Sequence, residues 1–262
     1  MTETLDSPFL RPGKVVMLTL LGIVVYLAAL VFWLPAGWVW QLCRDSVPLP
    51  PGVVIEKVSG QLWNGQVQVQ VMGHSLQAGW HLDGLMDGDR YLPLAWQLHT
   101  PRSHLQGQFQ LTGINAMALS AEGRINIPEF SREIQRSGGA IIQGDVTIDR
   151  FSLAAADGTL QALSGRASWP GGEVSWPMGA SRERAVLPPM KARLDRNQGR
   201  IALDISSASN PEPVISAQVQ PDGMMQIQLY RRLLDLVNQP WSGNAEPGDV
   251  VFSVRQRVLP AG

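Results

Sequence analysis

The sequence predicts a mainly β protein: a single N-terminal transmembrane helix followed by a domain of short, mostly antiparallel strands, arranged as an open curved sheet or a sandwich. Three observations lead to this prediction. One long stretch near the N-terminus is apolar and uncharged, the rest of the chain repeatedly alternates polar and apolar residues, and patterns typical of helices are scarce.

The apolar stretch runs from Val15 to Leu34, and thirteen of its residues are Leu, Ile, Val or Phe. As a helix it would be about 30 Å long, which matches the hydrocarbon core of a bilayer. A buried helix of a soluble core and a cleaved signal peptide are the alternatives, but a signal peptide has a shorter apolar run. Trp33, Trp38 and Trp40 around its end are typical of an interfacial aromatic belt. We therefore expect an uncleaved anchor.

Basic residues near the span predict its orientation. Arg11 and Lys14 precede it, whereas Arg44 alone lies close on the other side, so the positive-inside rule places the N-terminus in the cytoplasm. The expected location is the inner membrane of a Gram-negative cell, crossed once, with the C-terminal domain in the periplasm. The predicted parts are a cytoplasmic tail at 1–14, a transmembrane helix at 15–34, a proline-containing linker at 35–52 and a periplasmic β domain at 53–262.

Composition excludes some classes of protein. The net charge of the 262 residues is −1 and only 16% of them are charged, so no basic surface indicates nucleic-acid binding. Cys43 is the single cysteine and cannot form an internal disulfide. The outer domain must therefore be held together by its core.

Seven segments of the outer domain begin with a glycine and continue with alternating polar and apolar residues. This alternation is typical of a strand with one buried face, and glycine permits the turn or bulge at its entrance. The segments start at Gly65, Gly107, Gly123, Gly144, Gly172, Gly199 and Gly223. Their spacing is irregular, so a solenoid of fixed period is not expected.

Helices and long loops are few in this pattern. Leu233, Leu236 and Val237 form a narrow apolar stripe that predicts a short helix around 230–237, and Ser131–Arg136 has room for one or two turns. The segment 178–189 carries charged residues and two adjacent prolines, and it is predicted to be a loop.

A short internal similarity suggests two related halves, 53–150 and 151–262. Both segments read Ser-Gly, a few residues, Trp, one residue and Gly; the residues are Ser59, Gly60, Trp63 and Gly65 in one, and Ser164, Gly165, Trp169 and Gly171 in the other. Each could be a strand that turns at glycine, with the indole covering an end of the sheet. Chance pairing of frequent residues is the alternative.

Alternation also predicts one apolar face of the sheet, which something must cover. Its candidate residues are Val67, Val69, Val71, Leu94, Trp96, Leu98, Phe109 and Leu111. A second sheet over this face would give a closed sandwich, whereas no cover would give an open groove.

Residue patterns for catalysis, cofactors or metals are not found. The histidines His74, His81, His99 and His104 do not make the i, i+4 pair of a helical zinc site. Neither Ser-Gly pair fits the G-x-S-x-G nucleophile pattern, and no phosphate-binding glycine loop precedes a helix. We therefore expect no enzyme, no cofactor and no metal.

Three stretches after the single span carry a family resemblance: VSGQLWNGQVQV from Val58, LAWQL from Leu94 and LSGRASWPGGEVSW from Leu163. With them the chain resembles the type II secretion system protein N family from about residue 10 to its end. The resemblance implies an inner-membrane protein with a periplasmic domain, accessory to the system that exports folded proteins through an outer-membrane secretin. It carries no catalytic residues.

Two functions from different classes follow. The first is an anchored interaction component whose partners are other type II secretion proteins, namely the inner-membrane components and the secretin. The alternative is a lipid-binding or lipid-transfer protein whose one-sided sheet forms a β-groove for acyl chains. An enzyme acting on cell-wall glycans ranks third, because the sequence lacks a convincing carboxylate pair.

Overall fold

The computed structural model describes residues 12–44, 46, 49, 52–71, 73–84, 86–87, 90–136, 140–178, 181–197, 199–240 and 243–258. Most of the predicted cytoplasmic tail and five positions of the predicted linker, 45, 47, 48, 50 and 51, lie outside these residues.

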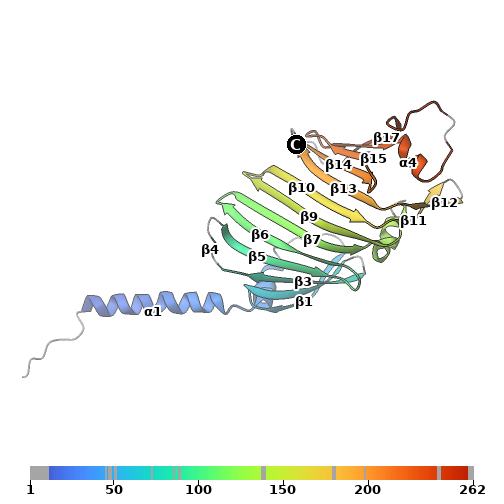
Figure 1. The fold of residues 1–262 in the computed structure, drawn as a ribbon. Helices are drawn as coiled ribbons and strands as arrows, with labels where there is room; N and C mark the ends of the chain where they lie inside the picture. Colours follow the sequence, from blue (N-terminus) through green and yellow to red (C-terminus); the bar gives the residue numbers. More distant parts are fainter. Residues whose placement is uncertain are drawn as a thin grey trace, which may run out of the picture.

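Two helices precede the β domain. Helix α1 spans Pro12–Phe32 and extends away from the sheet (Figure 1), and α2 spans Ala36–Cys43 inside the predicted linker. In the described part of the chain, no helix combines the length and the apolar character that crossing a membrane requires. The segment between the helices is tied to the first hairpin, because Leu62 N donates to Leu34 O at 3.0 Å and Pro35 forms a β-bridge with Gln61.

One large sheet forms the body of the protein. Its path follows chain order, every pairing along it is antiparallel, and β4 pairs with β5 beside the path. Its strands are β1 (Val53–Gly60), β2 (Asn64–Val71), β3 (His74–Leu82), β4 (Met86–Asp87), β5 (Arg90–His99), β6 (His104–Gly113), β7 (Ala116–Asn126), β9 (Asp145–Ala156), β10 (Thr159–Trp169), β13 (Met190–Asn197), β14 (Arg200–Ser207), β15 (Asn210–Val219), β16 (Met224–Tyr230) and β17 (Val250–Arg257). The prediction of a mainly β, antiparallel fold is confirmed, and of the two arrangements expected, the open sheet is the one found.

The path of the large sheet is interrupted by two excursions, which are segments that leave this sheet and form strands outside it. Between β7 and β9 lie the 3₁₀ helix η1 (Ile127–Phe130), α3 (Ser131–Arg136) and β8 (Ile141–Ile142); between β10 and β13 lie β11 (Gly172–Met178) and β12 (Ser181–Leu187). β8, β11 and β12 form a second, three-stranded sheet. Both short helices predicted from sequence are present, as α3 and as α4 (Arg231–Leu236).

The loop predicted at 178–189 is wrong, because β12 occupies most of it. Arg182, Arg184 and Val186 are exposed, whereas Glu183, Ala185 and Leu187 are half-buried. The arginines therefore occupy alternate, outward-facing positions of an antiparallel strand, which their clustering in sequence concealed.

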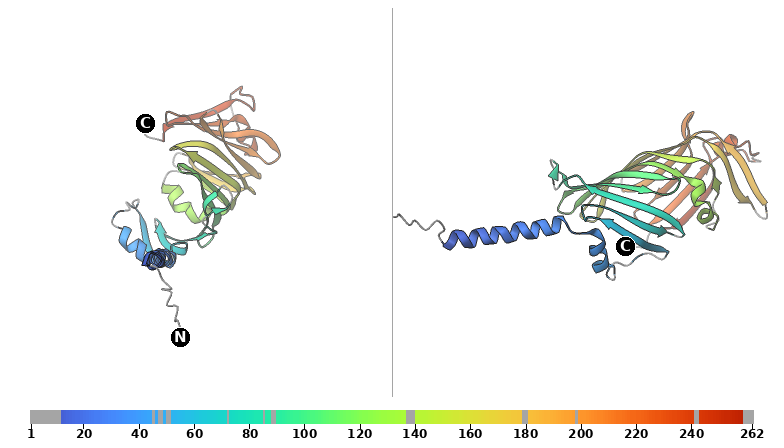
Figure 2. Two further views of the ribbon diagram at one scale, coloured as in Figure 1. Left: turned by 90° about the vertical axis from the view of Figure 1, so that its left-hand side faces the viewer. Right: turned by 90° about the horizontal axis from the view of Figure 1, so that it is seen from below.

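The sheet is curved rather than folded onto a second sheet (Figure 2). Apart from Pro93, the buried apolar residues among those described are Ala36, Trp169, Val174, Met190 and Val214. The last four form one cluster, against which parts of β8, β11, β14, β15 and α4 pack. A domain of this length normally buries a much larger core; most of the described apolar residues of the sheet are only half-buried.

The predicted boundary between two halves, at residues 150 and 151, falls inside β9. Because β9 pairs with both β7 and β10, the sheet passes through this point without interruption.

Candidate functional site

Two rows of apolar residues cross the whole sheet on one surface, which we call the apolar face. Each row takes one residue from each of the thirteen strands of the path, and each residue lies opposite its neighbour in the next strand. The first row is Val58, Val67, Ala78, Leu98, Leu105, Gly123, Ile148, Ala167, Ala192, Ile205, Ile215, Leu229 and Phe252. The second is Gly60, Gly65, Trp80, Trp96, Gly107, Ala121, Phe151, Gly165, Leu194, Leu203, Ala217, Ile227 and Val254. Neither row contains a charged residue.

All eight residues predicted to form an apolar face lie on this surface. Val67 and Leu98 belong to the first row and Trp96 to the second. Leu94 and Phe109 begin a third, partial row that continues through Leu119, Leu153 and Leu163. The remaining three, Val69, Val71 and Leu111, extend the face in β2 and β6. Their side chains are half-buried, and in the described part of the chain no second sheet packs over these strands. What the face binds stays a prediction.

Helices η1 and α3 hold one end of the apolar face. His74, at the start of β3, pairs with Glu133 of α3 at 3.2 Å between Nε2 and Oε2, and its ring centroid lies 5.8 Å from that of Phe130. A backbone hydrogen bond at Glu133, aided by His74 and opposed by desolvation, holds the pKa of the Glu133 carboxyl below its ordinary value. The two helices lie on the inner side of the curved sheet (Figure 2), so the apolar face is its inner face.

A second contact fixes η1 to the turn between β5 and β6. Thr100 Oγ1 and Ser103 Oγ both donate to Glu129 Oε2, at 2.6 and 2.7 Å, and Ser103 Oγ also accepts from Asn126 N at 3.0 Å. Ser103 is 8% exposed. These hydrogen bonds set the position of η1 and, through it, of α3.

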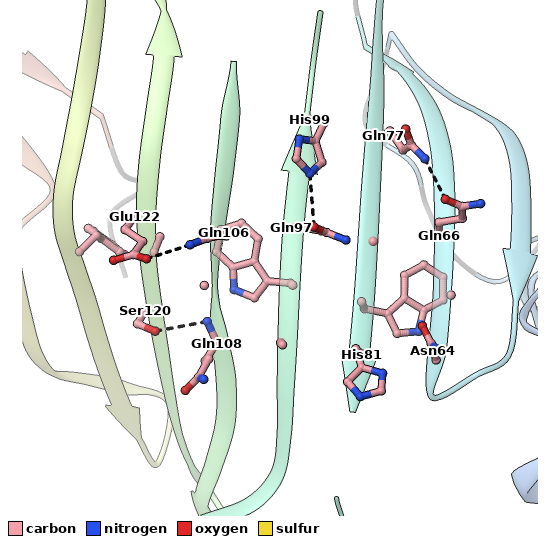
Figure 3. Close-up of a pocket in the computed structure, with 18 of the residues that line it drawn as sticks. Asn64, Gln66, Gln77, His81, Gln97, His99, Gln106, Gln108, Ser120 and Glu122 are labelled. Carbon is pink, nitrogen blue, oxygen red and sulfur yellow. Dashed lines mark hydrogen bonds between the residues drawn. The ribbon is translucent and has the colours of Figure 1, made fainter. Parts of the chain in front are cut away.

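A depression of about 1100 Å³ lies over the strands from β1 to β9. Its lining combines outward-facing polar residues with Trp80, Trp96 and Phe151 of the second row. The polar part of the lining includes several glutamines, and Figure 3 shows two of their contacts, Gln77 Nε2 to Gln66 Oε1 at 2.8 Å and Gln106 Nε2 to Glu122 Oε1 at 2.9 Å. An outward-facing sheet surface is ordinarily polar. The depression could hydrogen-bond to a polar ligand, but by itself it indicates none.

Catalytic groups do not converge in either place. The described lining of the depression holds one carboxylate, Glu122, and one guanidinium, Arg150, and a hydrolase of the common two-carboxylate type would need a pair of acidic residues. Within the residues described, no three His, Cys, Asp or Glu side chains are placed to hold a metal ion.

The two Ser-Gly-Trp-Gly segments occupy different structural contexts. Ser59 and Gly60 end β1 and Gly65 begins β2, with Trp63 in the turn between them. Ser164 and Gly165 instead lie in the middle of β10, at whose end Trp169 is buried. Trp169 Nε1 donates to Gln143 O at 2.8 Å, and Gly171 has a φ of 89°. The structure does not bring the two segments together.

The apolar face continues through strands that the sequence-based candidates did not include. Leu194, Leu203, Ile205 and Ile227 belong to the two complete rows. The alternation of Leu203, Ile205 and Ile227 was visible in the glycine-led segments at Gly199 and Gly223, whereas Leu194 lies before both segments. Only the register could show that they share a face with Val67 and Trp96.

Comparisons with known proteins agree with the resemblance read from the sequence. The chain is 27% identical over 254 residues to the type II secretion system protein N of Aeromonas hydrophila, an alignment that covers 94% of this chain and 91% of that protein. No solved structure matches the chain. The family described as type II secretion system (T2SS), protein N, matches residues 51–235, which is well over half of the sequence. The chain therefore belongs to the type II secretion system protein N family.

Proposed function

We propose that this protein is an accessory component of the type II secretion system, anchored in the inner membrane, with its β domain in the periplasm. There it takes part in the export of folded proteins across the outer membrane through contacts with other components, the inner-membrane proteins first and the secretin second. The family match over residues 51–235 is the observation that carries this proposal.

Helix α1 supports the anchoring part. The sequence places no charged residue between Val15 and Leu34, and the described apolar side chains of α1 are exposed, among them Val16 at 66% and Phe32 at 64%. An apolar surface of this size is costly in water. A bilayer would cover it.

The contact part is supported by the last strand of the sheet. β17 pairs with β16 on one side, and in the described residues no strand pairs with its other side. Phe252 is 56% exposed and Val250 43%. A free edge offers unpaired backbone N–H and C=O groups to which a partner can add a strand.

Fusion of a reporter after Gly262 tests the topology. A reporter that works only outside the cytoplasm should be active, and the protein should keep its full-length mass in the membrane fraction. A mature chain that begins between Ala36 and Cys43 would show that the apolar stretch is a cleaved signal and would overturn the anchor.

Cells that lack the protein test its role, because secretion of a type II substrate into the medium should fall and should recover on complementation. A photo-crosslinker at Ser253, on the free edge strand, should capture another secretion protein. The matched control position is Ser120, which is exposed on the polar face of an interior strand. A crosslinker at Ser120 should not capture a secretion protein. Unchanged secretion in the deletion strain would refute the role, and equal capture at both positions would refute the edge as the contact.

A further inference from the structure

We propose that the apolar face between β2 and β9 binds the acyl chains of membrane glycerophospholipid. This inference rests on the proposed function in one respect, because it takes α1 to lie in the inner membrane.

The chemistry of the lining favours hydrocarbon. Apart from His74, which contacts α3 at the start of β3, the inward-facing side chains used here are aliphatic or aromatic, and the indole N–H groups are the only polar atoms among them: Val67, Val69, Leu76, Ala78, Trp80, Leu82, Leu94, Trp96, Leu98, Leu105, Phe109, Leu119, Ala121, Phe151 and Leu153. An extended peptide laid on this surface would leave its backbone N–H and C=O groups without partners. An acyl chain has no such groups.

The length of the face also suits an acyl chain. From β2 to β9 the path makes five steps between paired strands, which is about 24 Å at the usual spacing of about 4.8 Å. The chains of one leaflet span about 15 Å, half of the hydrocarbon core. Each row between β2 and β9 is thus long enough to cover one chain.

Among the described residues, the covering elements do not contact this part of the face. Helix α3 is held at the ends of β3 and β5 through His74 and Glu129, and the buried cluster of α4, β8 and β11 lies over Trp169, Met190 and Ile205 farther along the sheet. Trp80, Phe109 and Leu119 lie in neither contact. Met117, beside them on β7, is 43% exposed.

The face begins next to the end of α1. Leu34 O accepts a hydrogen bond from Leu62 N, and Ala36 is 5% exposed where α2 packs on β1. These contacts fix the first hairpin of the sheet at the end of the apolar helix. Lipid that leaves the outer leaflet around α1 would meet β1 and β2 first.

Photo-crosslinking in cells labelled with ³²P-orthophosphate tests the proposal on the full chain. A photoreactive amino acid replaces Leu98, Leu119 or Leu153 on the apolar face, or the preceding or following residue Gln97, Ser120 or Ser152 on the outer face. A seventh position, Val24 in α1, reports on the anchor. We expect ³²P on the protein from the three inner positions and from Val24, none from the outer positions, and release of the label by phospholipase C.

Each outcome bears on a different claim. Capture at Val24 without capture at the inner positions would overturn lipid binding and leave the anchor intact. No capture at any position, Val24 included, would overturn both. Capture of a protein at the inner positions, or of a label that resists phospholipase C, would show that the face takes a different occupant.

A substitution separates binding from folding. With the photoreactive residue at Leu98, Leu119→Gln should reduce phospholipid capture several-fold because it places an amide in the third row, whereas Ser120→Gln on the outer face should leave capture unchanged. Resistance to trypsin identical to that of the parent protein shows that the variants are folded. Unchanged capture in folded Leu119→Gln would contradict the proposal.

Discussion

At the scale of single residues, two tryptophans of the apolar face lie over glycines of the neighbouring strands. A Cβ atom at Gly65 would come within 2.5 Å of Trp80 Cζ2, and one at Gly107 would come within 2.8 Å of Trp96 Cζ2 and overlap the carbonyl oxygen of Ser120. The second row of the apolar face is therefore close-packed at these two crossings, although in the part of the chain that the structure describes no second sheet packs over it. At Gly65 and Gly107 a side chain would collide with the indole rings, so glycine is needed at both positions.

Substitution at Gly107 tests this packing. Gly107→Ala should destabilise the protein by about 1–3 kcal/mol, the usual range for overpacking, because the backbone of β7 and the indole must both move. Gly113→Ala, in the same strand, meets only Ala116 Cβ at 3.4 Å and should be nearly neutral. Urea unfolding followed by tryptophan fluorescence measures both, and equal losses would contradict the crowding argument.

The contact between Glu133 and His74 predicts a dependence on pH. Because the pKa of Glu133 is lowered in the folded protein, its stabilising contribution is complete above the ordinary glutamate pKa and is lost as the pH falls through the lowered value. The difference in melting temperature between the parent protein and Glu133→Gln should therefore be present near neutral pH and vanish in acid. A difference that grows on acidification would have the wrong sign.

At the scale of elements, the two short helices η1 and α3 depend on one carboxylate. Glu129 accepts from Thr100 and from the buried Ser103, and a buried hydroxyl without its acceptor costs about 1–3 kcal/mol. Glu129→Ala should lower the free energy of unfolding by that amount. Glu122→Ala, an exposed carboxylate bonded to Gln106, should change it by less than about 0.5 kcal/mol.

Hydrogen exchange separates this effect from general loosening. In Glu129→Ala the amides of η1 and α3 should exchange faster, while those of β13 to β15 keep their protection. Uniform acceleration along the chain would show that Glu129 acts on the whole domain.

The strands could be predicted because alternation is a local pattern. QVQVQV after Gly65 and MMQIQL after Gly223 became β2 and β16, since each residue type reports the face it occupies. β12 was missed because Arg182 and Arg184 occupy outward positions that look like a charged loop in sequence. Helix α2 was not predicted, because the prolines that follow it are typical of a linker and residues 35–52 were assigned as one linker.

The register of the sheet could not be predicted. It depends on bulges, such as those between Ile55 and Lys57 and between Ala121 and Gly123, which shift the pairing by one residue and have no unique sequence pattern. For the same reason the sequence could nominate Val67 and Trp96 as one face but could not join them to Leu194 and Ile227. Local sequence patterns also could not predict whether the sheet is open or closed.

At the scale of the whole molecule, the open sheet predicts that its first strands stay folded when its last strands are removed. A chain that stops after Val219 lacks β16, α4 and β17 but keeps each pairing from β1 to β15. Limited proteolysis of spheroplasts should still yield a protected fragment that contains β1 to β9. Complete digestion of that fragment would mean that the last strands are needed to stabilise the first.

Each strand of the path pairs with the strand that precedes it in the path. The strand pairs can therefore form one after another as the chain is synthesised. Most strand pairs need only a short turn between neighbours, so the entropy of loop closure stays small for them. The exceptions are the two excursions and residues 231–249, which contain α4 and connect β16 to β17. The first hairpin, β1 and β2, can form as soon as residue 71 has left the ribosome, and each later strand can then pair with a strand that is already in place. The edge to which the next strand is added therefore moves from β2 toward β17 as the chain is synthesised.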